Sequence, residues 1–303
     1  MSPRANTVVI LGLGLIGGSL ARALRHSGFS QRFIGFGHRE PSLRRGVELG
    51  VIDDFTLDLD EAIAQADILV VCTPTLIAGD MLRQILPKLA ASSGGGPVIT
   101  DVASVKGNLR DAAVEVAGAM PPKLVLGHPI AGSERSGVEA SNAQLFVNHR
   151  VILTPVEEND PAAVELIRAM WDSTGAEVVD MSVAAHDAVL AATSHLPHVL
   201  AYALVDALAQ SDASDDIFRF AAGGFRDFTR IASSDPVMWR DIAIANKDAL
   251  LNAIDSFSEH LTELRQAVAE DNAEQLFDTF SRAKRARDEF AASLAQRSQP
   301  KTP

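Results

Sequence analysis

The stretch Gly12-Leu13-Gly14-Leu15-Ile16-Gly17 directly follows an apolar, β-branched run at residues 7–13 and opens a segment with helical spacing at 16–26. In such a strand–turn–helix setting, the first glycine permits a tight turn and the second lets the backbone approach a pyrophosphate. The third allows the helix to pack closely against the strand. The start of the helix offers unpaired N–H groups and a positive dipole end to phosphate. The sequence therefore predicts a dinucleotide site formed by Gly12, Gly14, Leu15, Ile16 and Gly17.

Short apolar strands and helical segments alternate through the first half of the chain. Further strands are expected at 32–36, 67–72, 97–101, 124–126, 150–154 and 176–180, and helices at 44–49, 61–66, 77–89, 105–117 and 161–175. This alternation is typical of a doubly wound parallel sheet covered by helices. We predict an α/β fold with an N-terminal Rossmann-like domain, in which the strand at 176–180 closes the sheet.

The character of the chain changes near residue 180. From Ser182 onward the sequence predicts long Ala/Leu-rich helices, at 186–209, 237–271 and 273–294. We therefore predict two domains, a dinucleotide-binding domain at 1–180 and an all-α substrate-binding and dimerisation domain at 181–303. Apolar residues of the helix at 237–271 fall on more than one stripe, so a homodimer through the helical domain is expected. They are Ile242, Ile244, Ala249, Leu250, Ile254, Phe257 and Leu261.

Composition limits the classes of partner. The 303 residues carry a formal net charge of -12, which opposes binding to nucleic acid or to anionic lipid. The longest apolar runs, such as residues 68–72, are far shorter than the roughly 20 residues of a membrane span. A short polar start argues against a signal peptide, and a single cysteine, Cys72, fits a reducing compartment and a place in the core. We expect a cytoplasmic protein with a small-molecule substrate and neither nucleic-acid nor membrane partners.

The residues after the second strand bear on the choice of cofactor. Gly37 stands where NAD-binding proteins carry an acid that accepts bonds from the ribose, and His38 and Arg39 follow it. A missing carboxylate beside a guanidinium group would accommodate the 2′-phosphate of NADP. Alternatively, Arg39 is solvated and Glu40 binds the ribose of NAD, and the sequence leaves both possibilities open. The further candidate cofactor contacts are His38, Arg39, Thr73 and Pro74.

Two segments place polar side chains just after strands. Asp101-Val-Ala-Ser104-Val-Lys106 offers a hydroxyl and an ammonium group; Lys106 is expected to meet an anion, and Ser104 to bind a ligand or to cap the following helix. His128-Pro129-Ile130-Ala131-Gly132-Ser133-Glu134 places a histidine in a Gly-rich turn, where it suits a general base. Taken alone, a loop histidine is more often a surface residue.

The helical half contains two further candidate groups. Ser194-His195-Leu196-Pro197-His198 puts two histidines on one helix face, but no third ligand has matching spacing, so no metal site is predicted. Gly223-Gly224-Phe225-Arg226-Asp227-Phe228-Thr229-Arg230 puts two arginines beside a double glycine. Arg230 is suited to bind a carboxylate with two hydrogen bonds; the alternative is an ion pair with Asp227 or Asp235.

Together, five motifs resemble the prephenate/arogenate (cyclohexadienyl) dehydrogenase family. They are GLGLIGGS, DVASVKG, HPIAGSERSG, SHLPH and GGFRDFTRIASSDPVMWRDI, and they extend from Gly12 to about Lys247. Each is modest alone, but five in this order make the match specific. The resemblance implies oxidative decarboxylation of prephenate, and possibly arogenate, with hydride transfer to NAD(P)+ in tyrosine biosynthesis. It also implies a homodimer, and Gly37 departs from the acid of the family.

The resemblance also implies roles for individual residues. His128 takes the proton of the substrate ring hydroxyl, and Ser104 contacts the same hydroxyl. His198 matches a histidine near the substrate side chain and favours the keto acid weakly, while Arg230 matches the residue that binds a substrate carboxylate. The other substrate-binding candidates are Ser133, Glu134 and Arg226, the last at a position where the family often has lysine. Neither a chorismate mutase segment nor an ACT domain is expected.

Two other classes of protein share part of the pattern. A β-hydroxyacid dehydrogenase also has a Rossmann domain followed by helices, but it would use a lysine base, and SHLPH contains none. A regulator that binds NAD(P) without turnover would have no use for the set formed by Ser104, His128 and Arg230. We therefore favour the dehydrogenase of cyclohexadienyl acids.

Overall fold

The computed structural model describes residues 4–90, 96–132 and 135–297. Contacts divide the chain into two compact units, residues 1–250 and 251–303. The first unit contains two β-sheets and helices α1 to α11. The second contains most of α12 (Lys247–Ala269) and all of α13 (Ala273–Arg297).

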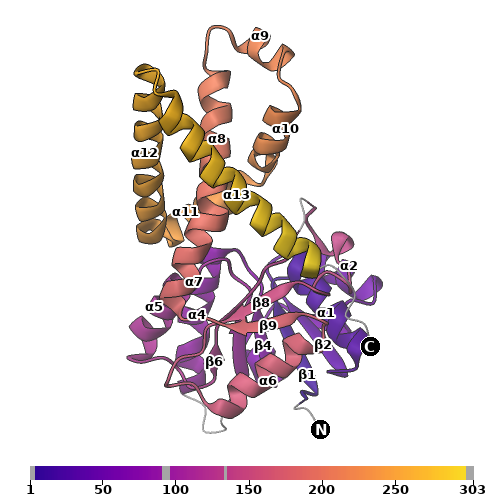
Figure 1. Ribbon diagram of the computed structural model, residues 1–303. Coiled ribbons are helices and arrows are strands. Elements are labelled where there is room, and N and C mark those ends of the chain that lie inside the picture. Colours follow the sequence, from indigo (N-terminus) through magenta and orange to yellow (C-terminus); the bar gives the residue numbers. More distant parts are fainter. Residues whose placement is uncertain (1–3, 91–95, 133–134, 298–303) are drawn as a thin grey trace. The chain divides into compact units, whose positions relative to one another are not determined.

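The first unit is built on a six-stranded parallel sheet with the order β3-β2-β1-β4-β5-β6 (Figure 1). Its strands are β1 (Thr7–Leu11), β2 (Arg32–Phe36), β3 (Asp54–Thr56), β4 (Ile68–Val71), β5 (Val98–Asp101) and β6 (Leu124–Val125). The direction of winding reverses between β1 and β4, which is where doubly wound sheets bind ligands. The predicted α/β, Rossmann-like fold is confirmed; strand β3 was missed because it is short and half polar.

Helices cover both faces of this sheet. They are α1 (Leu15–Ser27), α2 (Glu40–Glu48), α3 (Leu59–Ala64), α4 (Thr75–Ala90), α5 (Gly107–Ala117) and α6 (Pro161–Asp172). Alternate strand residues point to opposite faces. Thus Val8 and Ile10 pack in one core cluster with Leu24 of α1, whereas Val9 and Leu11 pack in the other with α4 and α5.

A second sheet of three strands has the order β7-β8-β9, formed by β7 (Gly127–Pro129), β8 (Arg150–Leu153) and β9 (Glu177–Asp180). Strand β7 is antiparallel to β8, and β8 is parallel to β9. The prediction that the strand at 176–180 closes the main sheet is therefore wrong. The reason lies at Gly127, whose backbone N–H and C=O are bonded by the side chains of Asp101 and Lys106 instead of by a neighbouring main-chain strand.

The chain then becomes helical, as predicted. Helix α7 (Val183–Leu190), a π-helical turn η2 (Ala191–His195) and helix α8 (Leu196–Ala209) follow one another without a break. Next come α9 (Ser214–Arg219), α10 (Gly223–Thr229), the 3-10 turn η3 (Arg230–Ser233) and α11 (Pro236–Ala245); another 3-10 turn, η1 (Val138–Ala140), precedes β8. Pro197 lacks an N–H group, and the wider π turn precedes it at the point where the regular ladder is interrupted.

The predicted single helix at 237–271 is two helices. Helix α11 ends at Ala245 and α12 begins at Lys247, and Asn246 between them has φ -106° and ψ 33°. The side chain of Asn246 donates to the backbone carbonyl of Asp187 and contacts Nδ1 of His195. A polar side chain tied to another helix thus marks the break, and an apolar pattern alone does not reveal it.

The stretch Val183–Ala209 is long and apolar enough to cross a membrane by length and composition alone, although its uninterrupted apolar runs are short. Only 22% of its most apolar window is buried. It carries His186, Asp187 and His195, and each of them is hydrogen-bonded to another part of the same unit. Ionisable side chains inside a bilayer are costly, so this apolar surface fits a protein interface better than a membrane span.

Candidate active site

The glycine motif forms an open cradle between β1 and α1. Gly12 has φ +99°, and a Cβ on it would lie 2.9 Å from the carbonyl oxygen of Cys72; a Cβ on Gly17 would lie 2.5 Å from the carbonyl oxygen of Gly12. A Cβ on Gly14 would meet nothing within 4 Å, and no side chain caps the start of α1. Backbone N–H groups therefore face open space at a helix start, an arrangement that fits a pyrophosphate. Burial raises the pKa of the neighbouring Cys72 thiol, which suits a core residue rather than a nucleophile.

Two groups border this cradle. Thr73 follows β4, and its hydroxyl is buried without a hydrogen-bond partner in the described part of the chain, while Pro74 beside it is exposed. His38 and Arg39 follow β2 and are exposed. Glu40 is engaged by Arg44, 2.5 Å away on the same helix. Among the described residues Arg39 forms no ion pair, so its guanidinium group can meet a ligand.

The predicted base, His128, lies in strand β7 rather than in the Gly-rich turn that follows it, and it is only 8% exposed. Its Nδ1 lies 2.9 Å from Nε2 of His186 on α7, and Nδ1 of His186 lies 2.8 Å from Oδ1 of Asp187. Burial lowers the pKa of His128 well below its ordinary value of 6.5, and the nearby Lys106, His186 and His195 act in the same direction. His128 is therefore neutral at physiological pH, as a general base must be.

Lys106 has a different role from the one predicted. It is completely buried, forms an ion pair with the buried Asp101, and donates from Nζ to the carbonyl oxygen of Gly127 at 2.7 Å. Asp101 accepts in turn from the N–H groups of Gly127 and Ala103. The anion that Lys106 meets is thus Asp101 rather than a ligand, because its completely buried ammonium group is bound by Asp101 and by the Gly127 carbonyl. Together the two side chains fix the backbone next to His128.

The same loop carries Ser104. The N-cap of α5 is Lys106, not Ser104, so the capping alternative is not realised. The Ser104 hydroxyl is half-buried and has no hydrogen-bond partner in the described ranges. Because Asp101 and Lys106 bind Gly127, the loop that carries Ser104 is anchored to the strand that carries His128.

A second group of side chains surrounds His198 on α8. Its Nδ1 contacts the carbonyl oxygen of Ser194 at 2.8 Å, and its ring stacks on Trp239 of α11 with centroids 3.5 Å apart. Burial lowers the pKa of His198, and the positive charge of Arg230, at the start of η3, lowers it further. His195 lies edge-on to Trp239, and burial lowers its pKa to about 4. Helix α8 contacts η3, so His198 and Arg230 lie on neighbouring elements.

The remaining candidates are not joined to these groups. Arg226 is exposed and forms a surface ion pair with Asp227 at 3.2 Å. Ser133 and Glu134 lie outside the described residues. Within the ranges that are described, no cluster of three or more metal-binding side chains occurs.

Sequence reasoning missed three members of the site, His186, Asp187 and Asn246. His186 and Asp187 form the only charged or titratable pair within the apolar segment at 183–192, which was a usable signal. Asn246 connects them to the second group, because its Nδ2 donates to the Asp187 carbonyl at 2.9 Å and contacts Nδ1 of His195 at 3.0 Å.

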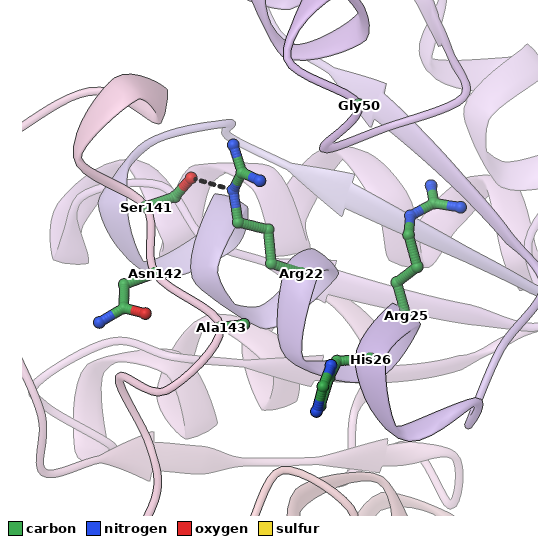
Figure 2. Close-up of a pocket in the computed structure, with 7 residues that line it drawn as sticks. All are labelled: Arg22, Arg25, His26, Gly50, Ser141, Asn142 and Ala143. Atoms are coloured by element: carbon green, nitrogen blue, oxygen red, sulfur yellow. Dashed lines mark hydrogen bonds between the residues drawn. The ribbon is translucent and has the colours of Figure 1, made fainter.

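A separate surface pocket of about 500 Å³ lies beside the C-terminal half of α1 (Figure 2). Its lining residues are Arg22, Arg25, His26, Gly50, Ser141, Asn142 and Ala143. Arg22 donates to the Ser141 hydroxyl at 2.8 Å, and Arg25 pairs with Asp53. The pocket contains none of the predicted catalytic or substrate-binding residues.

Comparisons with known proteins identify the family of this chain. The family model "Prephenate dehydrogenase, nucleotide-binding domain" matches residues 20–180, and "Prephenate dehydrogenase, dimerization domain" matches residues 182–282. The prephenate dehydrogenase of Bacillus subtilis is 39% identical over 95% of this chain and 77% of its own length. The cyclohexadienyl dehydrogenase of Zymomonas mobilis is 35% identical over 92% of this chain and 94% of its own.

Solved structures give the same result. The prephenate dehydrogenase of Aquifex aeolicus, determined with hydroxyphenyl propionate and NAD+, is 36% identical and superimposes with a TM-score of 0.87. The match covers 96% of this chain and 100% of that one. The chain therefore belongs to the prephenate dehydrogenase family of nicotinamide-dependent oxidoreductases.

Proposed function

We propose that this chain oxidises prephenate to 4-hydroxyphenylpyruvate and CO2, with His128 as the general base. The observation that carries the proposal is the buried, neutral His128, bonded to His186 and adjacent to the loop of Ser104. The direct test is to incubate the protein with prephenate and either NAD+ or NADP+ and to follow the absorbance of the reduced nicotinamide. Absence of reduction with both cofactors would overturn the proposal.

Each residue has a defined task in this reaction. The cradle of Gly12, Gly14 and Gly17 would hold a nicotinamide cofactor, which would supply the hydride acceptor for C4 of the substrate ring. His128 takes the proton of the 4-hydroxyl through Nε2, and Ser104 holds that hydroxyl in place. Arg230 binds a substrate carboxylate, and His198 lies near the side chain. Loss of CO2 from C1 restores an aromatic ring, so the protein supplies positioning and charge control rather than covalent chemistry.

The choice of substrate between prephenate and arogenate depends on the side chain, which carries a keto group in the first and an amino group in the second. We propose prephenate as the preferred substrate, because two of the relatives named above are prephenate dehydrogenases. The Nδ1 of His198 contacts the Ser194 carbonyl, so Nε2 is the nitrogen that remains for the substrate side chain.

For the cofactor, we propose that the cradle of Gly12, Gly14 and Gly17 holds the pyrophosphate and that the Thr73 hydroxyl offers a further contact. At the ribose, Glu40 is already bound by Arg44, and Gly37 supplies no carboxylate. These features favour NADP over NAD, with Arg39 meeting the 2′-phosphate.

Replacing Arg39 with alanine should then raise the KM for NADP+ by about tenfold or more and leave the KM for NAD+ unchanged within a factor of two. The physical reason is that only NADP carries the doubly charged 2′-phosphate. Initial rates at saturating prephenate measure both constants. Equal effects on the two cofactors, or none, would assign Arg39 to solvent and favour NAD.

We further propose a homodimer formed through the helices. The matching family model is that of a dimerization domain, and the stretch Val183–Ala209 leaves most of its apolar window uncovered. Within residues 251–303, large apolar side chains are also exposed, namely Leu251, Phe257, Leu261, Val268, Phe277, Phe280, Phe290 and Leu294. Such a surface fits an obligate interface larger than about 2,000 Å².

Sedimentation equilibrium tests the dimer. At micromolar concentration the mass should be about twice the 32.2 kDa of one chain, because the exposed apolar stripes need a second partner. Phe277→Glu, which buries a charge in the proposed interface, should shift the equilibrium toward the monomer. A single wild-type species near 32.2 kDa would contradict the dimer.

Two organisational predictions also remain proposals. We place the functional boundary near residue 180, where the two family models meet, although contacts divide the chain at 250. We propose a cytoplasmic location, supported by the single cysteine, and no partnership with nucleic acid, given the net charge of -12.

A further inference from the structure

Asp187 connects two segments of the candidate active site that are about 80 residues apart in sequence. Its Oδ1 accepts from the backbone N–H of Lys106 at 2.9 Å, and its Oδ2 accepts from the N–H of Gly107 at 2.7 Å. A Cβ on residue 107 would lie 2.7 Å from this Oδ2, so the close approach depends on glycine. The carboxylate therefore sits at the start of α5, where backbone N–H groups stabilise negative charge.

These hydrogen bonds determine which partner donates in the hydrogen bond between Asp187 and His186. Burial raises the pKa of Asp187, but bonds from His186, Lys106 and Gly107 lower it by more, so the group is an ionised carboxylate. A carboxylate can only accept hydrogen bonds, and Nδ1 of His186 lies 2.8 Å from Oδ1. His186 must therefore carry its hydrogen on Nδ1.

The position of the hydrogen on His186 determines the position of the hydrogen on His128. At a pH where His186 carries only the hydrogen on Nδ1, its Nε2 is unprotonated and can only accept. Nδ1 of His128, 2.9 Å away, must then donate. The remaining nitrogen of His128, Nε2, keeps a free lone pair, and it is the only nitrogen of that ring that can take a proton.

We propose that Asp187 is a positioning residue, which acts through His186 to fix His128 in the tautomer whose Nε2 accepts the substrate proton. The proposal rests on the proposed function of His128 as the base. The other groups that face His128 are Lys106 and His195, and both carry hydrogen bonds to fixed partners, the Gly127 carbonyl and Asn246. Neither of them bonds to a ring nitrogen of His128 in the described part of the chain, so the tautomer depends on His186 alone.

Asp187→Asn tests the proposal because it keeps the size of the side chain and replaces one accepting oxygen of the carboxylate with an NH2 group that donates. The variant removes the negative charge that holds the hydrogen on Nδ1 of His186, and either orientation of the amide sets its NH2 group against the N–H of Lys106 or of Gly107. With the NH2 group toward His186, it donates where the carboxylate accepted, and the hydrogens on both histidines reverse. His128 then carries its hydrogen on Nε2 and cannot act as the base. We expect kcat to fall by about 10²–10⁴-fold, while the KM values for prephenate and cofactor stay within a few-fold.

Two controls separate positioning from a general structural effect. Asp58→Asn replaces a carboxylate that also accepts from two backbone N–H groups, at the start of α3, and should leave turnover unchanged. The double variant Asp187→Asn/His128→Asn should lose no more activity than His128→Asn alone, because both changes remove the same base. Independent, multiplying losses in the double variant would overturn the proposal.

The tautomer can also be measured in the unaltered protein, which keeps the test valid if Asp187→Asn fails to fold. In ¹⁵N NMR at neutral pH, the His128 signals should show a protonated Nδ1 and an unprotonated Nε2, and they are assigned by their loss in His128→Asn. A protonated Nε2 would overturn the positioning role. Failure of the base itself is a different result, namely a His128→Asn variant that keeps its turnover.

Discussion

Replacing His128 with asparagine should lower kcat by about 10²–10⁴-fold and leave the KM for prephenate nearly unchanged. Asparagine retains the approximate size of the side chain and can still hydrogen-bond, but it cannot accept the proton of the 4-hydroxyl. The loss therefore falls on the chemical step, and steady-state kinetics at saturating cofactor measures it. The far-ultraviolet circular dichroism of the variant should match wild type, which confirms that the fold is intact. Turnover within a few-fold of wild type would remove His128 from the mechanism.

The low pKa of His128 adds a pH signature to the same experiment. The base works in its neutral form, and burial together with Lys106, His186 and His195 shifts its protonation to lower pH. Thus kcat/KM of the wild type should stay level as pH falls through 6.5, the ordinary imidazole value, and should decline only below it. An acidic limb centred at or above 6.5 would contradict the buried, neutral base.

The second large effect is expected for Arg230→Ala. Without the guanidinium group, a substrate carboxylate is left without its charged partner in a partly desolvated site, which costs about 2–5 kcal/mol. The loss should appear mainly as a higher KM for prephenate, while the dissociation constant of the cofactor, measured by fluorescence titration, stays unchanged.

A control for Arg230→Ala is Arg219→Ala. This side chain lies in the same helical region, where it stacks over Phe220, and carries the same charge. Arg219→Ala should leave the KM for prephenate within a factor of two of wild type, because loss of a positive charge alone does not explain the rise in KM expected for Arg230→Ala. If Arg230→Ala and Arg219→Ala behave alike, Arg230 serves the structure or the general field rather than the substrate.

The sequence was sufficient for five of the six strands of the main sheet and for the glycine turn after β1, because both depend on local signals. Alternating strands and helices, with glycines at fixed spacing, specify β1, α1 and the turn between them. Family membership also decides against the two alternatives, the β-hydroxyacid dehydrogenase and the non-catalytic regulator.

The second sheet, the hydrogen-bond partner of His128 and the helix break at Asn246 depend on contacts between residues that are distant in sequence. Strand β7 leaves the main sheet because side chains of Asp101 and Lys106 satisfy the backbone of Gly127. The partner of His128 is 58 residues away, and the break at Asn246 is tied to a helix 59 residues earlier in the chain. Hydrophobic periodicity carries no information about such pairings, so it predicts neither the ion pair of Lys106 with Asp101 nor the break in the helix expected at 237–271.

The buried pair of Asp101 and Lys106 has a consequence for how this family can change over time. Both side chains are fully enclosed, so losing one partner strands a charge in the interior, at a cost of about 3–5 kcal/mol, whereas losing both for apolar residues is much less harmful. Single substitutions at either position should therefore be purged from natural populations. Lineages that depart from this arrangement should have replaced the two residues together, leaving a signature of paired change five positions apart in their genes.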